Sequence, residues 1–535
     1  MHSIMAWMQE KEHTRSANST IARGAMVVMV AFVVSNLVGL LAKTLTARYF
    51  GTGIESSAFF AANRFSEILF NLVAGGALGS AFIPVFTGLL VNKEQKKAWK
   101  LASSIINIIT VVLIILSLLT ILFSKSVVRF VLAPGFNEAE TALTARLLQI
   151  QVLSSIIFGI SGLLMAILNS HQYFLLPAVA PAMYQVGWIF GILVLSKNMG
   201  VEGLAWGVVI GAGMHLLVQV PQTLKLKNRA YSPGFGLWMD EVKEVARLML
   251  PRLLGVAVIQ LNFLLNTYLA SFQQEGAITA ISLAFPLMIM PEAAIAQSIA
   301  IAALPTFSAL VAKNDLHQMR ETLASTLRAV IFLSIPASAG LVVMRKPIVQ
   351  LLYGGQAFDA KSVELVAWAL LWYAVGLLGH SIVEITSRAF YSLHDTRTPV
   401  FIGAGAMAAN LGLSFLFTAL FSNLGWMPHG GLALANSTAT AVESVILLVL
   451  MKRKMKGIAA PKIFKAFWKS TLASFLMVIT ILIINSNILN QSLAIRTIVP
   501  ISFGSVAYLI FLVFLKTSEV KMIITLIRKK LFAQK

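Results

Sequence analysis

Long uninterrupted runs of apolar residues dominate the chain. The runs at 105–123, 152–168 and 472–484 contain no charged side chain. They are longer than the roughly ten-residue alternating segments of a membrane β-barrel, and they suit α-helices, which need about 20 apolar residues to cross a bilayer. The pattern predicts fourteen spans, at residues 22–50, 54–91, 101–124, 142–169, 174–196, 201–224, 241–272, 276–312, 319–344, 362–391, 398–422, 429–451, 464–486 and 495–516.

The composition agrees with an all-α polytopic membrane protein. Of 535 residues, 58% are hydrophobic and 12% are charged, and the mean hydropathy is +0.83, whereas soluble proteins carry about a quarter charged residues. The chain has no cysteine, which excludes disulfides and thiol catalysis. We find no phosphate-binding Gly-Lys-Ser/Thr loop, His-Glu-x-x-His motif or nucleophile elbow, and the histidines do not cluster. We therefore predict a transporter, with no catalytic residues, metal site or cofactor.

The distribution of basic residues predicts the orientation in the membrane. Thirty of the 42 Lys and Arg residues lie at or near the termini and loops of one side, and nine lie on the opposite side. The positive-inside rule then places both termini in the cytoplasm, with residues 1–21 as a cytoplasmic extension. We interpret the net charge of +21 as topology and contact with anionic lipid headgroups, and we predict no nucleic-acid partner.

Three sequence matches at one offset indicate an internal repeat. Pro84 matches Pro305, Phe136 matches Phe358 and Pro177 matches Pro399, and the three separations agree to within a single position. Because the offset covers six predicted helices, an even number, the two copies should share one orientation. We predict an N-lobe at 22–224 and a C-lobe at 225–451 around a central cavity that opens by alternating access, followed by two helices and a basic tail at 452–535.

Ionisable residues inside the predicted spans are the candidate site residues, because charge within a bilayer is costly and usually functional. The first two helices and the seventh carry more basic than acidic groups, which suits an anionic cargo. Alternative roles remain: two close pairs, Arg64–Glu67 and Glu384–Arg388, suit ion pairs on single helices, and basic side chains near helix ends suit contact with headgroups. The candidates for substrate binding are Lys43, Arg48, Arg64 and Arg252, and those for ion coupling or ion pairing are Glu67, Glu292, Glu384 and Glu443.

Two of these positions carry particular expectations. Arg252 follows Pro251 near the expected cytoplasmic end of the seventh helix. Glu443 has no cation on its own predicted helix. We therefore expect either a partner for Glu443 on another helix or a role in proton or cation coupling.

Several segments resemble the MurJ (MviN) family of lipid II flippases in the MOP exporter superfamily. The similar segments are 35–39, 47–53, 58–60, 76–84, 133–136, 166–169, 177–181 and 390–399. The resemblance implies fourteen helices in two lobes in the bacterial inner membrane. It also implies a polyprenyl-pyrophosphate-linked peptidoglycan precursor as substrate, coupling to membrane potential or a monovalent cation, and cell-wall synthesis proteins as partners.

The chain departs from that family at the charged positions of the cavity. The positions where the family carries arginines and an acidic residue read Asn36, Ala42, Ser57, Phe70 and Pro286 here. Arg48 and Arg64 stay in register, and we interpret Lys43, Arg64 and Arg252 as substitutes, since a pyrophosphate in a low dielectric needs fixed cations. Two alternatives remain: an exporter of another lipid-linked oligosaccharide or amphipathic molecule, and a transport-inactive envelope scaffold.

Overall fold

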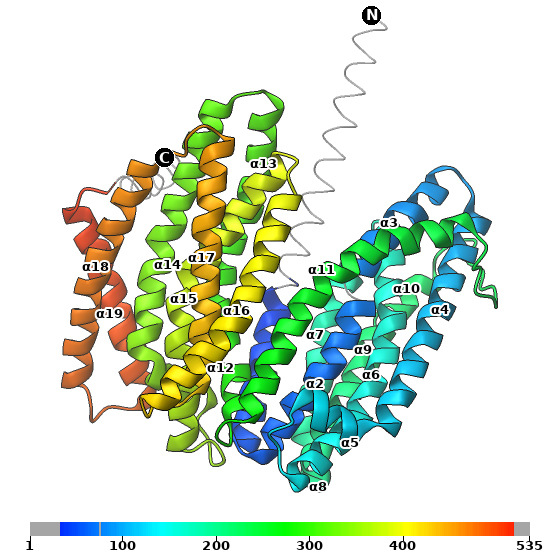
Figure 1. Ribbon diagram of the computed structural model, residues 1–535, viewed down its shortest axis with the longest axis horizontal. Helices are drawn as coiled ribbons and strands as arrows, with labels where there is room; N and C mark the ends of the chain where they lie inside the picture. The colour runs from blue at the N-terminus through cyan, green and yellow to red at the C-terminus, as the bar shows by residue number, and fades with distance from the viewer. Residues whose placement is uncertain (1–30, 32, 74–75, 518–535) are drawn as a thin grey trace, which may run out of the picture. The chain divides into compact units, whose positions relative to one another are not determined.

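The computed structural model describes residues 31, 33–73 and 76–517, and the described part contains helices and no strand. Twelve stretches are long and apolar enough to cross a membrane (Figure 1). They are α4 (Gln95–Leu122), α6 (Glu138–Ser170), α7 to α8 (Leu175–Met199), α9 to α10 (Val201–Leu224), α11 (Asp240–Ser271), α12 to α13 (Ala277–Ala312), α14 (Leu316–Tyr353), α15 (Ala360–Ser392), α16 (Arg397–Asn423), α17 (His429–Lys454), α18 (Ala460–Asn487) and α19 (Leu493–Phe514).

The first two predicted spans correspond to three helical segments of the described part. Residues 33–50 are helical, and the second prediction covers two helices, α2 (Ile54–Val73) and α3 (Gly76–Val91). Residues 1–21 lie outside the described part. The fold is confirmed as all-helical with membrane spans throughout, while the count of fourteen stays a prediction.

Short irregular helices interrupt or extend several spans. The four-residue α5 (Ser124–Val127) leads into the π-helix η1 (Val128–Leu132), and η2 (Gly191–Leu195) separates α7 (Leu175–Phe190) from α8 (Ser196–Met199). Similarly, η3 (Ala293–Gln297) joins α12 (Ala277–Glu292) to α13 (Ser298–Ala312). α14 is longer than the predicted 319–344, because Pro347 lies inside it without ending it.

The chain divides into two compact units. Unit 1 comprises Met1–Phe50 and Ile54–Tyr268, and unit 2 comprises Gly51–Gly53 and Leu269–Lys535. Most of α11 therefore groups with unit 1, whereas the repeat assigns this helix to the second lobe. The two divisions differ because the repeat follows sequence symmetry and the compact units follow packing. The lobe boundary at 224/225 stays a prediction based on the repeat.

Matching helices begin at the offset that the sequence predicts. The helices α6 and α15 have the same length, 33 residues. The first residues of α6 and α15 are separated by the same offset as Pro177 and Pro399, and so are the first residues of α7 and α16. The first residues of α4 and α14 are separated by the same offset as Pro84 and Pro305. Asx caps precede both of the equally long helices: Asn137 accepts a hydrogen bond from the Glu140 N–H and Asp359 from the Ser362 N–H. The shared cap satisfies one of the free N–H groups at each helix start.

The turns between these helices also repeat. Gln172 and His394 have φ of 63° and 57°, and Lys93 and Asn314 have φ of 61° and 55°. Each pair is separated by the repeat offset, and each residue follows a helix as a left-handed cap. The two sequence copies therefore fold into the same local backbone.

The two helices after the repeat pack within unit 2. Met477 of α18 and Tyr508 of α19 join a buried cluster with Phe332 and Met344 of α14. The Tyr508 hydroxyl donates to the Phe332 carbonyl at 2.7 Å. The helices α18 and α19 are thus attached to α14, in agreement with their prediction as an addition to the repeat.

Candidate functional site

An ion pair on α2 is the centre of the polar cluster in unit 1. The Arg64 guanidinium donates to Glu67 Oε2 at 2.7 Å, and the Asn63 amide donates to Glu67 Oε1 at 2.8 Å. These residues lie one turn apart, which is the spacing at which helical side chains meet. The predicted Arg64–Glu67 pair is present, and Asn63 completes the coordination of its carboxylate.

Lys43 lies beside this pair. It is half-buried on the helix at residues 33–50 and interacts electrostatically with Glu67 and with Arg64. Tyr184 of α7 is also within the electrostatic range of Glu67. Lys43 and Tyr184, from two other helices of unit 1, therefore both lie within the electrostatic range of Glu67.

The Arg64 guanidinium also lies on an aromatic ring of α11. Its Cζ is 5.0 Å from the centroid of the Phe263 ring, a cation–π distance. Its Nε is buried without a hydrogen-bond partner among the described residues. A guanidinium with a remaining donor is suited to an additional anionic oxygen, and the fork geometry of arginine favours phosphate.

The other two predicted basic residues lie outside this cluster. Arg48 is exposed on the same helix as Lys43, and Arg252 is exposed on α11. Arg252 is twelve residues, or about 18 Å, beyond Asp240, the first residue of α11. It is also eleven residues, about 16 Å, from Phe263 on the same helix. The structure therefore brings Lys43 and Arg64 together but does not add Arg252 to them.

Unit 2 contains a buried carboxylate next to the π-helix η3. Glu292 is the last residue of α12. Its side chain is 4% exposed and accepts a hydrogen bond from Gln297 Nε2 at 2.9 Å. Glu384 of α15 lies within its electrostatic range. π-helices are frequent at functional sites. Two predicted acidic residues of unit 2 thus lie within electrostatic range of each other.

Glu384 and Glu443 have different surroundings. Glu384 Oε1 accepts from Arg388 at 2.7 Å, which confirms the predicted same-helix pair, and Arg388 lies 5.8 Å from the Tyr391 ring. Glu443 of α17 faces α16, where a Cβ added to Gly403 would be 3.3 Å from its Oε1. The absence of a side chain at Gly403 leaves room for this carboxylate.

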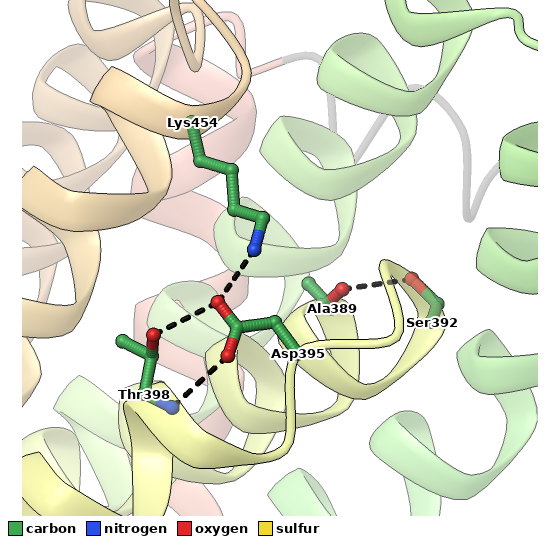
Figure 2. A network of polar contacts seen from close by, with 5 residues as sticks. All are labelled: Ala389, Ser392, Asp395, Thr398 and Lys454. Atoms are coloured by element: carbon green, nitrogen blue, oxygen red, sulfur yellow. Dashed lines mark hydrogen bonds and ion pairs between the residues drawn. The ribbon is translucent and has the colours of Figure 1, made fainter.

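A third polar network connects the α15–α16 turn to the end of α17 (Figure 2). Asp395 Oδ1 accepts from the Thr398 N–H at 3.0 Å, and Oδ2 accepts from the Thr398 hydroxyl at 2.8 Å and from Lys454 Nζ at 2.5 Å. The bonds from Lys454 and Thr398 hold the pKa of Asp395 at about 2. Asp395 is therefore ionised, and its hydrogen bonds link the start of α16 to the end of α17.

Sequence comparison identifies the family. The family model described as "Lipid II flippase MurJ" matches residues 46–504. The chain belongs to the MurJ lipid II flippase family. The match includes Lys454 and the segment 390–399, one of those that carry the resemblance.

Curated relatives and solved structures agree with this assignment. The chain is 30% identical to the probable lipid II flippase MurJ of Bdellovibrio bacteriovorus, over 86% of this chain and 88% of that protein. It is 28% identical to the lipid II flippase MurJ of Burkholderia cenocepacia, over 82% and 85%. Its fold matches a MurJ structure in an inward closed conformation, with a TM-score of 0.78, 24% identity and coverage of 92% of this chain and 99% of that one. An inward-facing multidrug MATE transporter of the MOP superfamily also matches, with a TM-score of 0.67, 14% identity and coverage of 80% and 98%.

Sequence reasoning missed the neutral residues that complete these clusters. Asn63, Phe263, Gln297 and Gly403 carry no charge, and their roles depend on helix rotation. The helical spacing of Asn63 and Glu67 was the available signal for one of them. The whole of α16 separates Lys454 from the turn of Asp395 in the sequence, so no local pattern could have paired these two.

Proposed function

We propose that this chain is a lipid II flippase that moves undecaprenyl-pyrophosphate-linked peptidoglycan precursor across the bacterial inner membrane by alternating access. The supporting observation is the family match across residues 46–504, which covers the spans of both units. The role is that of a transporter and not of an enzyme. Both termini lie in the cytoplasm in this proposal, because the basic residues concentrate on that side.

The Lys43–Arg64 cluster of unit 1 is the proposed contact for the pyrophosphate. Lys43 stands next to Ala42, where the family carries an arginine, and Arg64 is already oriented by Glu67 and Phe263. Glu67 keeps the guanidinium in place between transport events, and a substrate phosphate competes for the same donors. Arg48 and Arg252, which are exposed and outside the cluster, would contact the substrate only at other stages of transport.

Complementation of a bacterium depleted of its own lipid II flippase tests this proposal. The parent chain should restore growth, while Lys43→Ala and Arg64→Ala should fail and Arg64→Lys should rescue weakly, because lysine keeps the charge and loses the fork. Lys346→Ala is the matched control, since Lys346 is a half-exposed cation paired with Glu364. Rescue by all variants would retain the flippase and reject the cluster, and failure of a parent present in the membrane would reject the flippase.

The vacated arginine positions favour one second candidate, an exporter of another lipid-linked oligosaccharide. Asn36, Ala42 and Phe70 provide no charge for a pyrophosphate, so the headgroup that binds here need not be that of lipid II. Purified protein in vesicles containing either lipid II or another polyprenyl-linked oligosaccharide distinguishes the two, because only the true substrate is translocated.

We also propose that the carboxylates of unit 2 couple transport to a proton or monovalent cation. Glu292 is buried next to Glu384, and two nearby carboxylates favour sharing a positive ion. Glu292→Gln should preserve the hydrogen-bonding shape and reduce the dependence of lipid II translocation on an imposed ion gradient. Unchanged dependence in this variant would assign coupling to the membrane potential alone.

A further inference from the structure

The loop between α10 (Val220–Leu224) and α11 lies along the side of a membrane helix. This loop, residues 225–239, is fifteen residues long and has no regular secondary structure. Structureless loops of this length are uncommon in compact domains and are usually either functional loops or linkers. Figure 1 shows it beside α4 at the edge of unit 1.

Hydrogen bonds fix the loop at successive levels of α4. Asn228 donates to Gln95 Oε1, the Ser232 N–H donates to Ser103 Oγ at 3.1 Å, and Asn107 Nδ2 donates to the Gly234 carbonyl at 2.8 Å. From Gln95 to Asn107 is twelve residues, or about 18 Å of helix. The loop therefore descends along α4 instead of extending away from it.

The loop then turns back toward the start of α11. Gly236 has φ of +53°, and a Cβ there would be 2.4 Å from Ser104 Oγ, so only glycine fits this close approach in a left-handed conformation. The Met239 N–H donates to the Gly236 carbonyl at 2.9 Å. Leu237 and Trp238 lie between Gly236 and Met239 in the sequence, and therefore near the level of Ser104 on α4.

The level of Ser104 matches the expected surface of the hydrocarbon core. Lys100 is the last charged residue of α4, and residues 103–122 form a stretch of twenty residues, or about 30 Å, the thickness of that core. Asn107 is thus about 6 Å inside the boundary. At this depth backbone groups need partners, and Asn107 and Ser103 provide them for Ser232 and Gly234.

The side chains of the loop suit a membrane interface. Trp238 is 88% exposed, and Tyr231, Phe235 and Leu237 are 67%, 46% and 59% exposed. Tryptophan and tyrosine concentrate at this depth in membrane proteins. The neighbouring segments 93–100 and 225–247 carry nine basic against four acidic side chains, and this surplus complements anionic headgroups.

We propose that residues 225–239 form an interfacial strap, which inserts Leu237 and Trp238 into the boundary region of an anionic phospholipid bilayer and thereby fixes the start of α11 at the membrane surface. The occupant of this apolar surface is lipid. The proposal does not depend on the transported substrate, and its test requires no transport.

Single spin labels in this cysteine-free chain provide the test. The full chain carrying Trp238→Cys, and separately Leu237→Cys with Trp238 retained, is labelled and reconstituted into vesicles of phosphatidylcholine with an equal part of phosphatidylglycerol. Both labels should collide more with oxygen, which dissolves in lipid, than with water-soluble NiEDDA. Lys313→Cys, in an exposed turn before α14, is the control and should show the reverse. Preferential collision with NiEDDA at both 237 and 238 would overturn the proposal.

Two further measurements examine the anchoring and the occupant. In the parent chain, vesicles with phosphatidylglycerol should protect the label at position 238 from NiEDDA better than vesicles of phosphatidylcholine alone. Replacing Lys225, Lys227 and Arg229 together with glutamine should abolish this difference between the two lipids. Equal protection of the parent's label in the two lipids would overturn the anionic preference. Asn107→Leu should raise NiEDDA collisions of the label at position 238, because the loop loses the hydrogen bond from Asn107 to the Gly234 carbonyl. Low collision rates of that label with both oxygen and NiEDDA would show that protein covers this surface, and would overturn the assignment to lipid.

Discussion

Within each unit, hydrogen bonds from one or two neighbouring side chains orient the charged residues. Glu67 is held by Arg64 and Asn63, and Glu292 by Gln297. Such contacts reduce the cost of placing charge inside a membrane protein. They also keep the side chain ready for exchange with a ligand, because each partner can donate to another acceptor.

Asp395 illustrates a residue whose partners lie on different helices. It receives hydrogen bonds from Thr398 at the start of α16 and from Lys454 at the end of α17. The two charged side chains are 18% and 37% exposed, so solvent screens the pair in part. We expect Asp395→Asn and Lys454→Met each to destabilise unit 2, with a coupling energy of about 1 kcal/mol in a double-mutant cycle of thermal unfolding in detergent.

The pH dependence of this effect follows from the direction of the shift. The folded-state pKa of Asp395 is lowered to about 2 from 3.8, so its stabilisation is complete above pH 4 and is lost as pH falls toward 2. The stability difference between the parent and Asp395→Asn should stay constant from pH 5 to pH 8. A difference that shrinks in this range would contradict an ionised Asp395.

At the scale of elements, glycines set how closely two helices of unit 1 approach. A Cβ added to Gly187 of α7 would be 2.2 Å from Gly211 Cα, and one added to Gly207 would be 2.6 Å from Gly191 Cα. These glycines are spaced four residues apart on α7–η2 and on α9 (Val201–Leu217), the pattern of small residues that lets membrane helices pack backbone to backbone. Trp188 follows Gly187 and donates a hydrogen bond to Thr46 Oγ1 at 3.0 Å. Thr46 lies on the same helix as Lys43, so this bond connects the glycine contact to that helix.

Alanine at one of these glycines should disrupt the helix pair. Gly207→Ala should lower stability by about 1–3 kcal/mol through overpacking, measured as a lower midpoint of thermal unfolding. Gly213→Ala on the same helix is the control, because a Cβ there meets nothing within 4 Å and alanine has the higher helix propensity. Equal effects of the two substitutions would reject the close approach.

At the scale of the whole molecule, the repeat organises the chain. One offset, constant to within a single position, recurs in helix starts and in left-handed turns. The paired helices α6 and α15 also share their length. Because the offset covers six predicted helices, an even number, we expect equivalent turns to face the same side of the membrane.

Single cysteines test the orientation of the chain. Lys313→Cys should be protected from an impermeant maleimide in intact cells, because its turn is expected in the cytoplasm, whereas Lys197→Cys should be labelled. Both residues are exposed, and labelling of permeabilised cells controls for reactivity. The reverse pattern would place the termini outside.

The sequence by itself determined the helices and the repeat. Apolar runs define spans because a backbone in lipid must satisfy its own hydrogen bonds, and matching prolines and phenylalanines at one offset revealed the duplication. Same-helix pairs such as Arg64–Glu67 were also readable, since helical spacing is local. The length of α14 could not be predicted in this way, because Pro347 is accommodated within the helix and does not end it.

Contacts between helices were decided only by the tertiary structure. The union of Lys43 with Arg64, the separation of Arg252 from both, and the bond from Lys454 to Asp395 depend on how each helix is rotated about its axis. An apolar helix with polar residues on several sides does not fix that rotation, because lipid accepts any apolar face. Packing through glycines such as Gly207 fixes which faces of α9 and α7–η2 meet, and no local sequence pattern specifies the corresponding choice for the helices that carry these charges.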